Sequence, residues 1–391
     1  MTTDPLRILM VAPTPYFADR GCHVRIFEEA RALVRRGHEV RIVTYHLGRD
    51  VGGIPTVRIP AVPWYRRLSA GPSWQKPFLD ILLFITLARE IRRFSPTILY
   101  AHLHEGAFVS IPLSSVWRLP LLFDCQGSLT GEILDHRFVR KGSLLERFFA
   151  EIEGWINRHA GVIVTSSTPL ARSLVEGWGV PPERVVPLPD GVDTDRFTPG
   201  DRTAARRELS LPPDLPVLAY LGVMNRYQGV DLLLEAMGIL KERGVEVHLL
   251  LMGYPDQPYR EMTSRLGLSR LVTVTGRIPY DDAPRLLSAA DFAVSPKLSR
   301  TEANGKLLDY LACGLPVVCF DTPVNREILG EEGILVPYGD LAGLADGIAR
   351  LARDGELRRR LGEGARRRAV ERHGWGARGE ELERIIRQAV S

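Results

Sequence analysis

Short apolar runs that alternate with helix-patterned stretches constrain the fold of this chain more than any other feature. Arg7–Ala12 is a brief apolar run, typical of a strand buried on both faces of a parallel sheet. A glycine-containing loop follows, and apolar residues at helical spacing predict a helix over 22–36. Gly37 would end this helix, and Glu39–Thr44 begins the pattern again as a second strand.

The same strand–helix alternation continues through most of the chain. Repeated units of this kind predict a parallel sheet covered by helices on both faces. The C-terminal third reads as helical and rich in arginine. Further strands are predicted at 98–101, 121–124, 161–165, 184–188, 217–222, 245–252, 271–275, 291–295, 316–320 and 333–336.

A change in composition divides the pattern into two runs. Residues 190–213 are rich in Asp, Arg, Pro and Thr, which is typical of a connection between domains. We therefore expect an α/β protein with two Rossmann-like domains that face a cleft. The predicted parts are residues 1–197, a linker over 198–213, and residues 214–375, with about 376–391 returning to the first domain. Ligands of such sheets bind at the carboxyl ends of strands, so the cleft is the expected site.

Composition excludes several other classes of protein. Apolar residues make up 45% of the 391 residues and the formal net charge is +4, so the chain can build two ordinary cores. No finger, homeodomain or RNA-binding signature indicates a nucleic-acid partner. The four cysteines form no CxxC pair, which favours a reducing compartment over a zinc site or disulfide framework. The N-terminus does not resemble a signal peptide, so we expect a cytoplasmic protein.

Four stretches in the expected order resemble family-4 retaining glycosyltransferases of the GT-B fold. They are VVPLPDGVDTDRF at 185–197, AYLGVMNRYQGVDLLLEA at 219–236, TGRIPYDDAPRLLSAADFAVSP at 275–296 and EANGKLLDYLACGLPVV at 302–318. The resemblance covers both predicted domains. It implies transfer of a hexose from a nucleotide-diphosphate sugar, linked to UDP or GDP, onto a hydroxyl acceptor. It also implies retention of anomeric configuration without a metal or other cofactor.

The loop before the predicted helix at 306–312 is expected to bind the donor diphosphate. Glycine at 305 allows close backbone approach, the helix start offers N–H groups, and Lys306 adds a full charge. Asn304 belongs to the same turn. Asp309 matches the second acid of the family pattern, which holds the ribose hydroxyls. The first acid is absent from its usual place, and Glu302 is its candidate replacement after a shift of one residue.

Positive charge around the diphosphate departs from the family pattern. The resemblance implies an Arg after the first glycine of the loop at 222–229 and a Lys before the second, and neither is present. Arg226 is the nearest cationic substitute, and Lys297 lies on the approach to the donor loop. Lys306 and Arg226 are the preferred phosphate-binding cations. Glu327 matches a Glu that contacts the nucleotide or sugar in relatives, although it could be an ordinary helix Glu. Arg277 falls in the stretch whose backbone reads the base.

In the first predicted domain, Gly21 and His104 are the candidate catalytic residues. In relatives a glycine at the start of the first helix lets backbone amides face the donor. His104, expected to end a strand in AHLHEG, resembles a His that contacts the transferred sugar and could move a proton. His102 is the alternative, but its side chain would point to the other face of the strand. Gln126 stands where relatives often have a second His.

Other motif-like spellings are discounted. Asp193-Thr194-Asp195 has the DxD form that holds a metal in another fold, but here Asp193 is expected to make a turn. No P-loop surrounds Lys306, and no GxGxxG follows the first strand, so neither ATP hydrolysis nor dehydrogenase activity is indicated. No metal ligands are therefore predicted.

Residues 64–94 contain mixed aromatic and basic side chains and an apolar helix candidate at 78–88. This composition can lie in a lipid headgroup layer, although the helix could equally be domain core with its arginines solvated. Membrane-surface contact would place the protein peripherally at the inner face of the membrane. It would also fit a lipid-linked or cell-envelope acceptor.

Two other functions remain open at this stage. A nucleotide-sugar epimerase would keep the same fold and donor site but need no acceptor. A non-catalytic nucleotide-binding relative is the second alternative, because several family residues are missing. Turnover of a donor with or without an acceptor separates the three.

Overall fold

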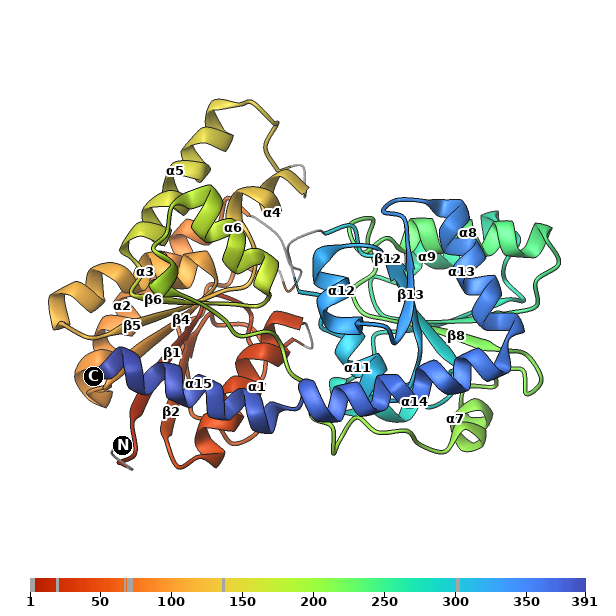
Figure 1. The fold of residues 1–391 in the computed structure, drawn as a ribbon. Coiled ribbons are helices and arrows are strands. Elements are labelled where there is room, and N and C mark those ends of the chain that lie inside the picture. Colours follow the sequence, from red (N-terminus) through yellow and green to blue (C-terminus); the bar gives the residue numbers. More distant parts are fainter. Residues whose placement is uncertain (1–3, 19–20, 67, 69–72, 136–137, 300–302) are drawn as a thin grey trace. The chain divides into compact units, whose positions relative to one another are not determined.

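The computed structural model describes residues 4–18, 21–66, 68, 73–135, 138–299 and 303–391. The chain forms two compact units, each an α/β sandwich around one parallel sheet (Figure 1). The first contains the chain up to Asp190 together with Trp375–Ser391, and the second contains the main part of the intervening chain. The C-terminal helix thus belongs to the first unit.

The first unit has a sheet of seven parallel strands in the order β3-β2-β1-β4-β5-β6-β7. Its strands are β1 (Arg7–Ala12), β2 (Glu39–Thr44), β3 (Thr56–Arg58), β4 (Ile98–His102), β5 (Leu121–Cys125), β6 (Val162–Thr165) and β7 (Val185–Pro187). Its helices are α1 (Gly21–Arg35), α2 (Lys76–Phe94), α3 (Leu103–Trp117), α4 (Leu129–Asp135), α5 (Leu144–His159), α6 (Thr168–Trp178) and α15 (Trp375–Val390).

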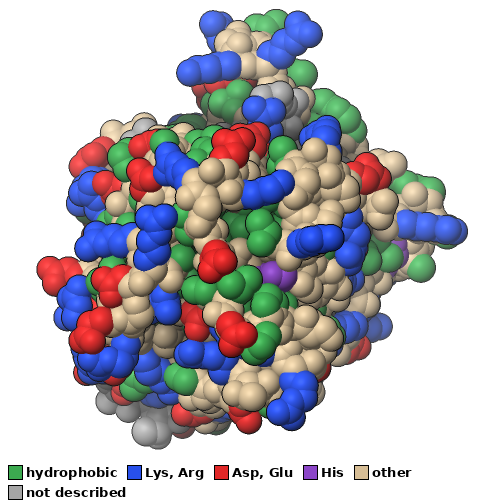
Figure 2. Space-filling view, turned by 90° about the vertical axis from the view of Figure 1, so that its right-hand side faces the viewer, with side chains coloured by type: hydrophobic (Ala, Val, Ile, Leu, Met, Phe, Trp, Pro, Cys, Tyr) green, Lys and Arg blue, Asp and Glu red, His purple; other side chains and the backbone are tan. Residues whose placement is uncertain are grey.

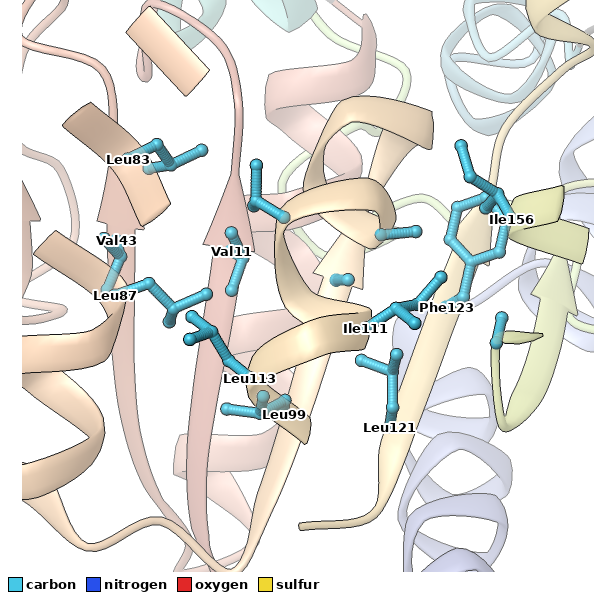
Figure 3. Packing of buried hydrophobic residues seen from close by; sticks show 14 of the residues in the cluster. Val11, Val43, Leu83, Leu87, Leu99, Ile111, Leu113, Leu121, Phe123 and Ile156 are labelled. Atoms are coloured by element: carbon cyan, nitrogen blue, oxygen red, sulfur yellow. The ribbon is translucent and has the colours of Figure 1, made fainter. Parts of the chain in front are cut away.

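Alternate residues of each strand face opposite helical layers. Figure 3 shows Leu83 and Leu87 of α2 directed toward Val43 and Val11 of the sheet, in the core that α3 also covers. On the other side, α15 packs against α1 (Figure 1), where a methyl group added at Gly379 would collide with Ala32. Burial on both faces explains the continuous apolar runs.

The second unit has six parallel strands in the order β10-β9-β8-β11-β12-β13. They are β8 (Val217–Leu221), β9 (His248–Met252), β10 (Val272–Gly276), β11 (Phe292–Ser295), β12 (Val317–Phe320) and β13 (Gly333–Val336). The helices are α7 (Arg202–Glu208), α8 (Val230–Glu242), α9 (Gln257–Arg265), α10 (Ala283–Leu287), α11 (Lys306–Ala312), α12 (Pro323–Leu329), α13 (Leu341–Arg353) and α14 (Gly355–Arg372).

The stretch 198–213, expected to be a linker, packs as part of the second unit. Asp201 caps α7 by accepting a hydrogen bond from the Ala204 amide, and Ala205 is buried. Arg206 of α7 donates to the Ala289 carbonyl and pairs with Asp291. The abundance of Asp and Arg in this stretch therefore reflects a cap and an ion pair rather than a solvated connection.

Both sheets place a switch in strand order beside the predicted site residues. Strand order reverses between β1 and β4 in the first unit and between β8 and β11 in the second. Ligands of open α/β sheets bind outside the carboxyl ends of strands at such points. The loop after β8 and the segment after β11 contain the predicted residues 226, 297 and 304–306. Topology alone thus marks these segments as a candidate site.

Surface charge is mixed on the face shown in Figure 2. Lys and Arg side chains drawn there are interspersed with acidic and hydrophobic ones, so that face presents no continuous basic stripe. Such a stripe is the usual electrostatic footprint of nucleic-acid binding.

Candidate functional site

The loop after β8 is held against the end of β11 by close backbone contacts. Gly229 adopts φ +74° at the start of α8, and a Cβ there would lie 2.0 Å from the carbonyl oxygen of Pro296. No other residue fits that position without displacing backbone. The amide of Leu298 donates to the Tyr227 carbonyl at 3.0 Å, which joins the two segments again.

Lys306, the first residue of α11, points its ammonium group toward this loop. Its Nζ donates to Oε1 of Gln228 at 2.7 Å and to the Tyr220 hydroxyl at 3.3 Å. The Nζ atom also lies 4.5 Å from the centre of the Tyr220 ring. Among the residues that the structure describes, no carboxylate lies within ion-pair distance of Lys306. The ammonium is thus held by uncharged partners.

The electrostatics around Lys306 favour an anionic ligand. Burial, with a smaller contribution from the positive charge of Lys297, lowers the pKa of Lys306 well below its usual value. Lys297 is itself buried, with its Nζ 5.7 Å from the Tyr227 ring centre. The positive charge of Lys306 carries an unfavourable desolvation energy that a bound anion would offset.

Asn304 is a structural link in this loop rather than an open donor. Its Nδ2 donates to Oδ1 of Asn325 at 3.0 Å, and its Oδ1 accepts from the Ser295 hydroxyl at 3.1 Å. Asn325 in turn donates to the Phe320 carbonyl. These buried bonds tie the start of α11 to β11, β12 and α12.

The amide groups at the start of α11 are partly used within the chain. The amides of Leu307 and Leu308 donate to the carbonyls of Asn304 and Gly305, each at 2.9 Å. Gly305 has ordinary helical dihedrals, so its conformation does not require glycine. The capacity of this segment to bind an anion therefore rests mainly on the Lys306 ammonium, and less on the helix end than the sequence indicated.

The other predicted residues of the second unit lie at varied positions. Arg226 and Arg277 are exposed, and the Arg277 guanidinium lies over the Tyr254 ring at 5.2 Å. Asp309 is half-buried in the first turn of α11. Glu327 lies beyond the first turn of α12, and its carbonyl accepts a bond from Arg368. Their donor-binding roles remain predictions, and Glu302 falls outside the described residues.

His104 does not end a strand, contrary to the sequence prediction. Strand β4 stops at His102, Leu103 adopts φ +60°, and His104 is the second residue of α3. The left-handed residue turns the chain abruptly, which the local apolar pattern did not reveal. His104 packs edge-on to Phe123, and burial lowers the pKa of its imidazole, although the charge of Glu153 opposes the shift. It is therefore neutral at neutral pH.

Gly21, the other catalytic candidate, is exposed at the first position of α1. A Cβ built on Gly21 meets no atom within 4 Å. Its own packing therefore does not demand glycine, and the predicted contact of its backbone with the donor stays a prediction.

A buried ionic cluster lies on the α1 face of the first sheet. Arg25 pairs with Glu29 at 3.0 Å, with Asp124 at 2.8 Å and with Asp190 at 2.6 Å. His102 donates through Nδ1 to the same Asp124 at 2.9 Å, across the β4–β5 register. Burial alone would raise the pKa of Asp124, but Arg25 and His102 hold it below its usual value.

This cluster has the side chains of a metal site but not its electrostatics. Glu29, His102 and Asp124 are the group with suitably close ligand atoms among the described residues. The Arg25 guanidinium already pairs with both carboxylates, so a metal ion would have to displace it. We assign the cluster to structure. It also explains why His102 is fully buried and unsuited to contact a substrate.

The Asp193 carboxylate of the DxD spelling stabilises a local turn of the backbone. One carboxylate oxygen of Asp193 accepts hydrogen bonds from the backbone amides of Asp195 at 3.1 Å and Arg196 at 3.2 Å. This is the turn that the sequence predicted for Asp193.

Sequence reasoning missed the partners of Lys306. Gln228 stands where the family resemblance implies a lysine. Tyr220 lies in a predicted strand, and the strand pattern does not reveal its contact with Lys306. Both partners are distant from Lys306 along the chain and meet it only because β8 and β11 are neighbours. The one available signal was the tyrosine in an otherwise aliphatic strand, since a buried hydroxyl needs a partner.

Comparisons with known proteins agree with this architecture. The family model described as "Glycosyl transferase 4-like domain" matches residues 20–219, and that described as "Glycosyl transferases group 1" matches residues 215–354. A D-inositol 3-phosphate glycosyltransferase from Geodermatophilus obscurus is 30% identical, over 89% of this chain and 80% of that protein. The reported relatives are named as glycosyltransferases, so the epimerase alternative gains no support.

Solved structures match over nearly the whole chain. Sucrose-phosphate synthase from Thermosynechococcus elongatus superposes with a TM-score of 0.83 at 20% identity, covering 97% of this chain and 98% of that one. HepE from Anabaena, in complex with UDP and glucose, gives a TM-score of 0.78 at 16% identity, covering 98% and 100%. With both family models matched in order along two parallel-sheet units, the chain belongs to the family-4 glycosyltransferases of the GT-B fold.

Proposed function

We propose that this glycosyltransferase moves a hexose from a nucleoside-diphosphate sugar to a hydroxyl acceptor, with retention of configuration and without a metal ion. The observation that carries the donor assignment is the partly buried Lys306 ammonium with its uncharged partners at the carboxyl end of β8. A diphosphate leaving group gains negative charge in the transition state, and a preorganised cation stabilises that charge.

The second buried lysine adds to this argument. Lys297 lowers the pKa of Lys306, so both charges act on the same region. The binding of UDP by HepE, a protein of the same fold, makes UDP the first nucleotide to test, with GDP second.

Metal independence follows from the same arrangement. Lysine charges can supply the electrostatic stabilisation that a divalent cation provides elsewhere. The Asp193 carboxylate of the DxD spelling is engaged in a turn, and Arg25 occupies the buried Glu29 cluster. Retention is the outcome that the family resemblance implies, and His104 is the candidate residue for contact with the transferred sugar.

A nucleotide screen followed by a turnover assay tests the proposal. We expect UDP or GDP to raise the unfolding temperature, because a ligand that binds only the folded state stabilises it. The matching sugar nucleotide should then release its nucleotide with EDTA present at an unchanged rate. Proton NMR of the fresh product should show the donor's anomeric configuration. Loss of turnover on chelation would refute metal independence. A product of inverted configuration would refute retention.

A further inference from the structure

The first unit contains an apolar cavity that His104 lines from one side. It lies among α2, α3, α4 and α5 and has a volume of about 610 Å³, within the range of roughly 300–1,000 Å³ typical of small-molecule sites. Aromatic side chains from three helices form much of its wall: Phe84, Phe108, Phe149 and Trp155. The cavity is thus built within a single unit.

Helix α2 presents apolar residues both to the core and to this cavity. Leu83 and Leu87 are buried and point toward the sheet (Figure 3). On another face of the helix, Ile81 is 59% exposed and Phe84 is 37% exposed, and both line the cavity. A helix that is apolar on both sides normally buries both, so the cavity face is suited to an apolar ligand.

The charged side chains around the cavity already have partners. Lys76 pairs with Glu105 at 2.6 Å, and the Tyr45 hydroxyl donates to Asp80 at 2.5 Å. Burial, and to a smaller extent Glu105, raises the pKa of Asp80 to about 7, so its negative charge is partly suppressed at neutral pH. The lining therefore offers no surplus cation for a multiply charged anion.

One buried polar atom of the lining lacks a hydrogen bond. His104 is 6% exposed, and its Nε2 has no hydrogen-bond partner among the described residues. The nearest acidic oxygen, Oε1 of Glu153, is 3.8 Å away, which is too long for a hydrogen bond. An unsatisfied buried group of this kind is costly, and a ligand hydroxyl would satisfy it.

We propose that this cavity holds the hydrocarbon chain of an amphiphilic acceptor whose polar end reaches His104. The inference rests on the proposed function, because it names the class of acceptor for that transfer. An apolar wall with a single imidazole that lacks a hydrogen bond at Nε2 fits an alkyl or isoprenoid chain that carries a hydroxylated head. It does not fit a small, multiply charged acceptor, which would need several free cations.

The surroundings of the cavity fit delivery of such a molecule from a lipid surface. At the start of α5, Leu144 is 81% exposed and Phe148 is 58% exposed, with exposed Lys141 and Arg147 beside them in sequence. Apolar and basic side chains together favour an anionic lipid interface. Within the described ranges, no helix has the length and apolarity needed to cross a bilayer.

Binding of n-alkyl β-glucosides of increasing chain length, below their micelle concentrations, tests the proposal directly. If the chain enters the cavity, each added methylene should tighten binding by about fourfold, equivalent to ~0.8 kcal/mol, until the cavity is full. Calorimetry should also show a heat-capacity change that grows more negative with chain length. Affinity that does not depend on chain length would overturn the proposal.

Two matched variants on α3 locate the binding. Phe108 lines the cavity and is 46% exposed, whereas Val116 on the same helix is 72% exposed and does not line it. Phe108→Glu should remove the chain-length dependence, and Val116→Glu should leave it intact. Ile152→Trp, which fills the cavity from α5 without adding charge, should shorten the longest chain that binds. Equal effects of Phe108→Glu and Val116→Glu would contradict the assignment.

Two further measurements separate this inference from the proposed function. Nucleotide binding and nucleotide release are followed in the same proteins. If they persist in the wild type while alkyl chains do not bind, the acceptor class is wrong and the transferase assignment stands. Alkyl binding that depends on chain length, without any nucleotide binding, would support the cavity assignment and refute the donor assignment. Binding only to anionic phospholipid vesicles, with none to monomeric glucosides, would overturn the cavity proposal. It would indicate that the protein contacts the lipid surface instead.

Discussion

The Nζ atom of Lys306 lies 2.7 Å from Oε1 of Gln228, and this pair joins the start of α11 to the loop after β8. The family resemblance implies a lysine near position 228, where this chain has glutamine. The amide cannot supply charge, but its oxygen fixes the ammonium of Lys306 in place. One lysine positioned by a neutral partner thus occupies the region that two cations share in relatives.

Replacing Lys306 by alanine should abolish most of the catalytic activity. Removal of one preorganised charge-stabilising donor typically costs about 10²–10³-fold in turnover. Steady-state nucleotide release from the sugar nucleotide measures the effect. Lys241→Ala is the matched control, because Lys241 is exposed on α8 and bonds only the Gly267 carbonyl. A Lys306→Ala enzyme with wild-type turnover would show that Lys306 has no role in the reaction.

Nucleotide binding should weaken as the pH rises. The pKa of Lys306 is depressed in the free protein, and a bound diphosphate would raise it by favouring the charged form. Binding must therefore take up a proton at pH values between the free and bound pKa. Calorimetry in buffers of different ionisation enthalpy measures this uptake. Lys306→Arg keeps its charge at all accessible pH values, so uptake should disappear in that variant. Absence of uptake in the wild type would mean that Lys306 is not beside the phosphates.

Asn304→Ala should destabilise the fold before it affects donor binding. The variant removes the hydrogen bonds that Asn304 makes with the Ser295 hydroxyl and with Oδ1 of Asn325, which costs about 1–3 kcal/mol of unfolding free energy. Urea denaturation measures the loss. Exposed Gln257→Ala should stay within about 0.5 kcal/mol of the wild type. If Asn304→Ala instead weakened nucleotide binding at unchanged stability, its amide would be a ligand contact as first predicted.

Arg25→Met should be the most destabilising single change among those considered. It leaves Glu29 and Asp124 buried without their cation, and breaking a buried pair from one side costs about 3–5 kcal/mol. Arg35→Met, an exposed change at the end of the same helix, provides the comparison in thermal denaturation. Similar melting temperatures for the two variants would show that the cluster is not maintained as an ionic unit.

Protonation of Asp124 in the same cluster should lower the stability of the wild-type protein at acid pH. The pKa of Asp124 is depressed in the folded protein. Its contribution is therefore present above the unfolded pKa of an Asp, near ~3.9, and is lost as pH falls toward the folded value. Denaturation midpoints of the wild type should decline below about pH 4, and those of Arg25→Met should decline less steeply.

The periodic core elements could be predicted from local pattern. Strands β1, β2 and β13 and helix α11 match their predicted bounds, because apolar runs and helical spacing are properties of neighbouring residues. The short edge strand β3 was missed, since three half-buried residues carry little apolar signal. The predicted helix within 78–88 extends over Lys76–Phe94, because exposed arginines at its end obscured the pattern.

The amino-acid sequence by itself determined the two-sheet α/β architecture, the family and the lysine that begins α11. Only the tertiary structure decided that Lys306 meets Gln228, that Arg25 is buried among acids, and that apolar faces of α2, α3 and α5 enclose a cavity. Periodicity reports which face of an element is apolar, but not what that face meets. Those contacts depend on strand order and helix packing between residues far apart in the chain.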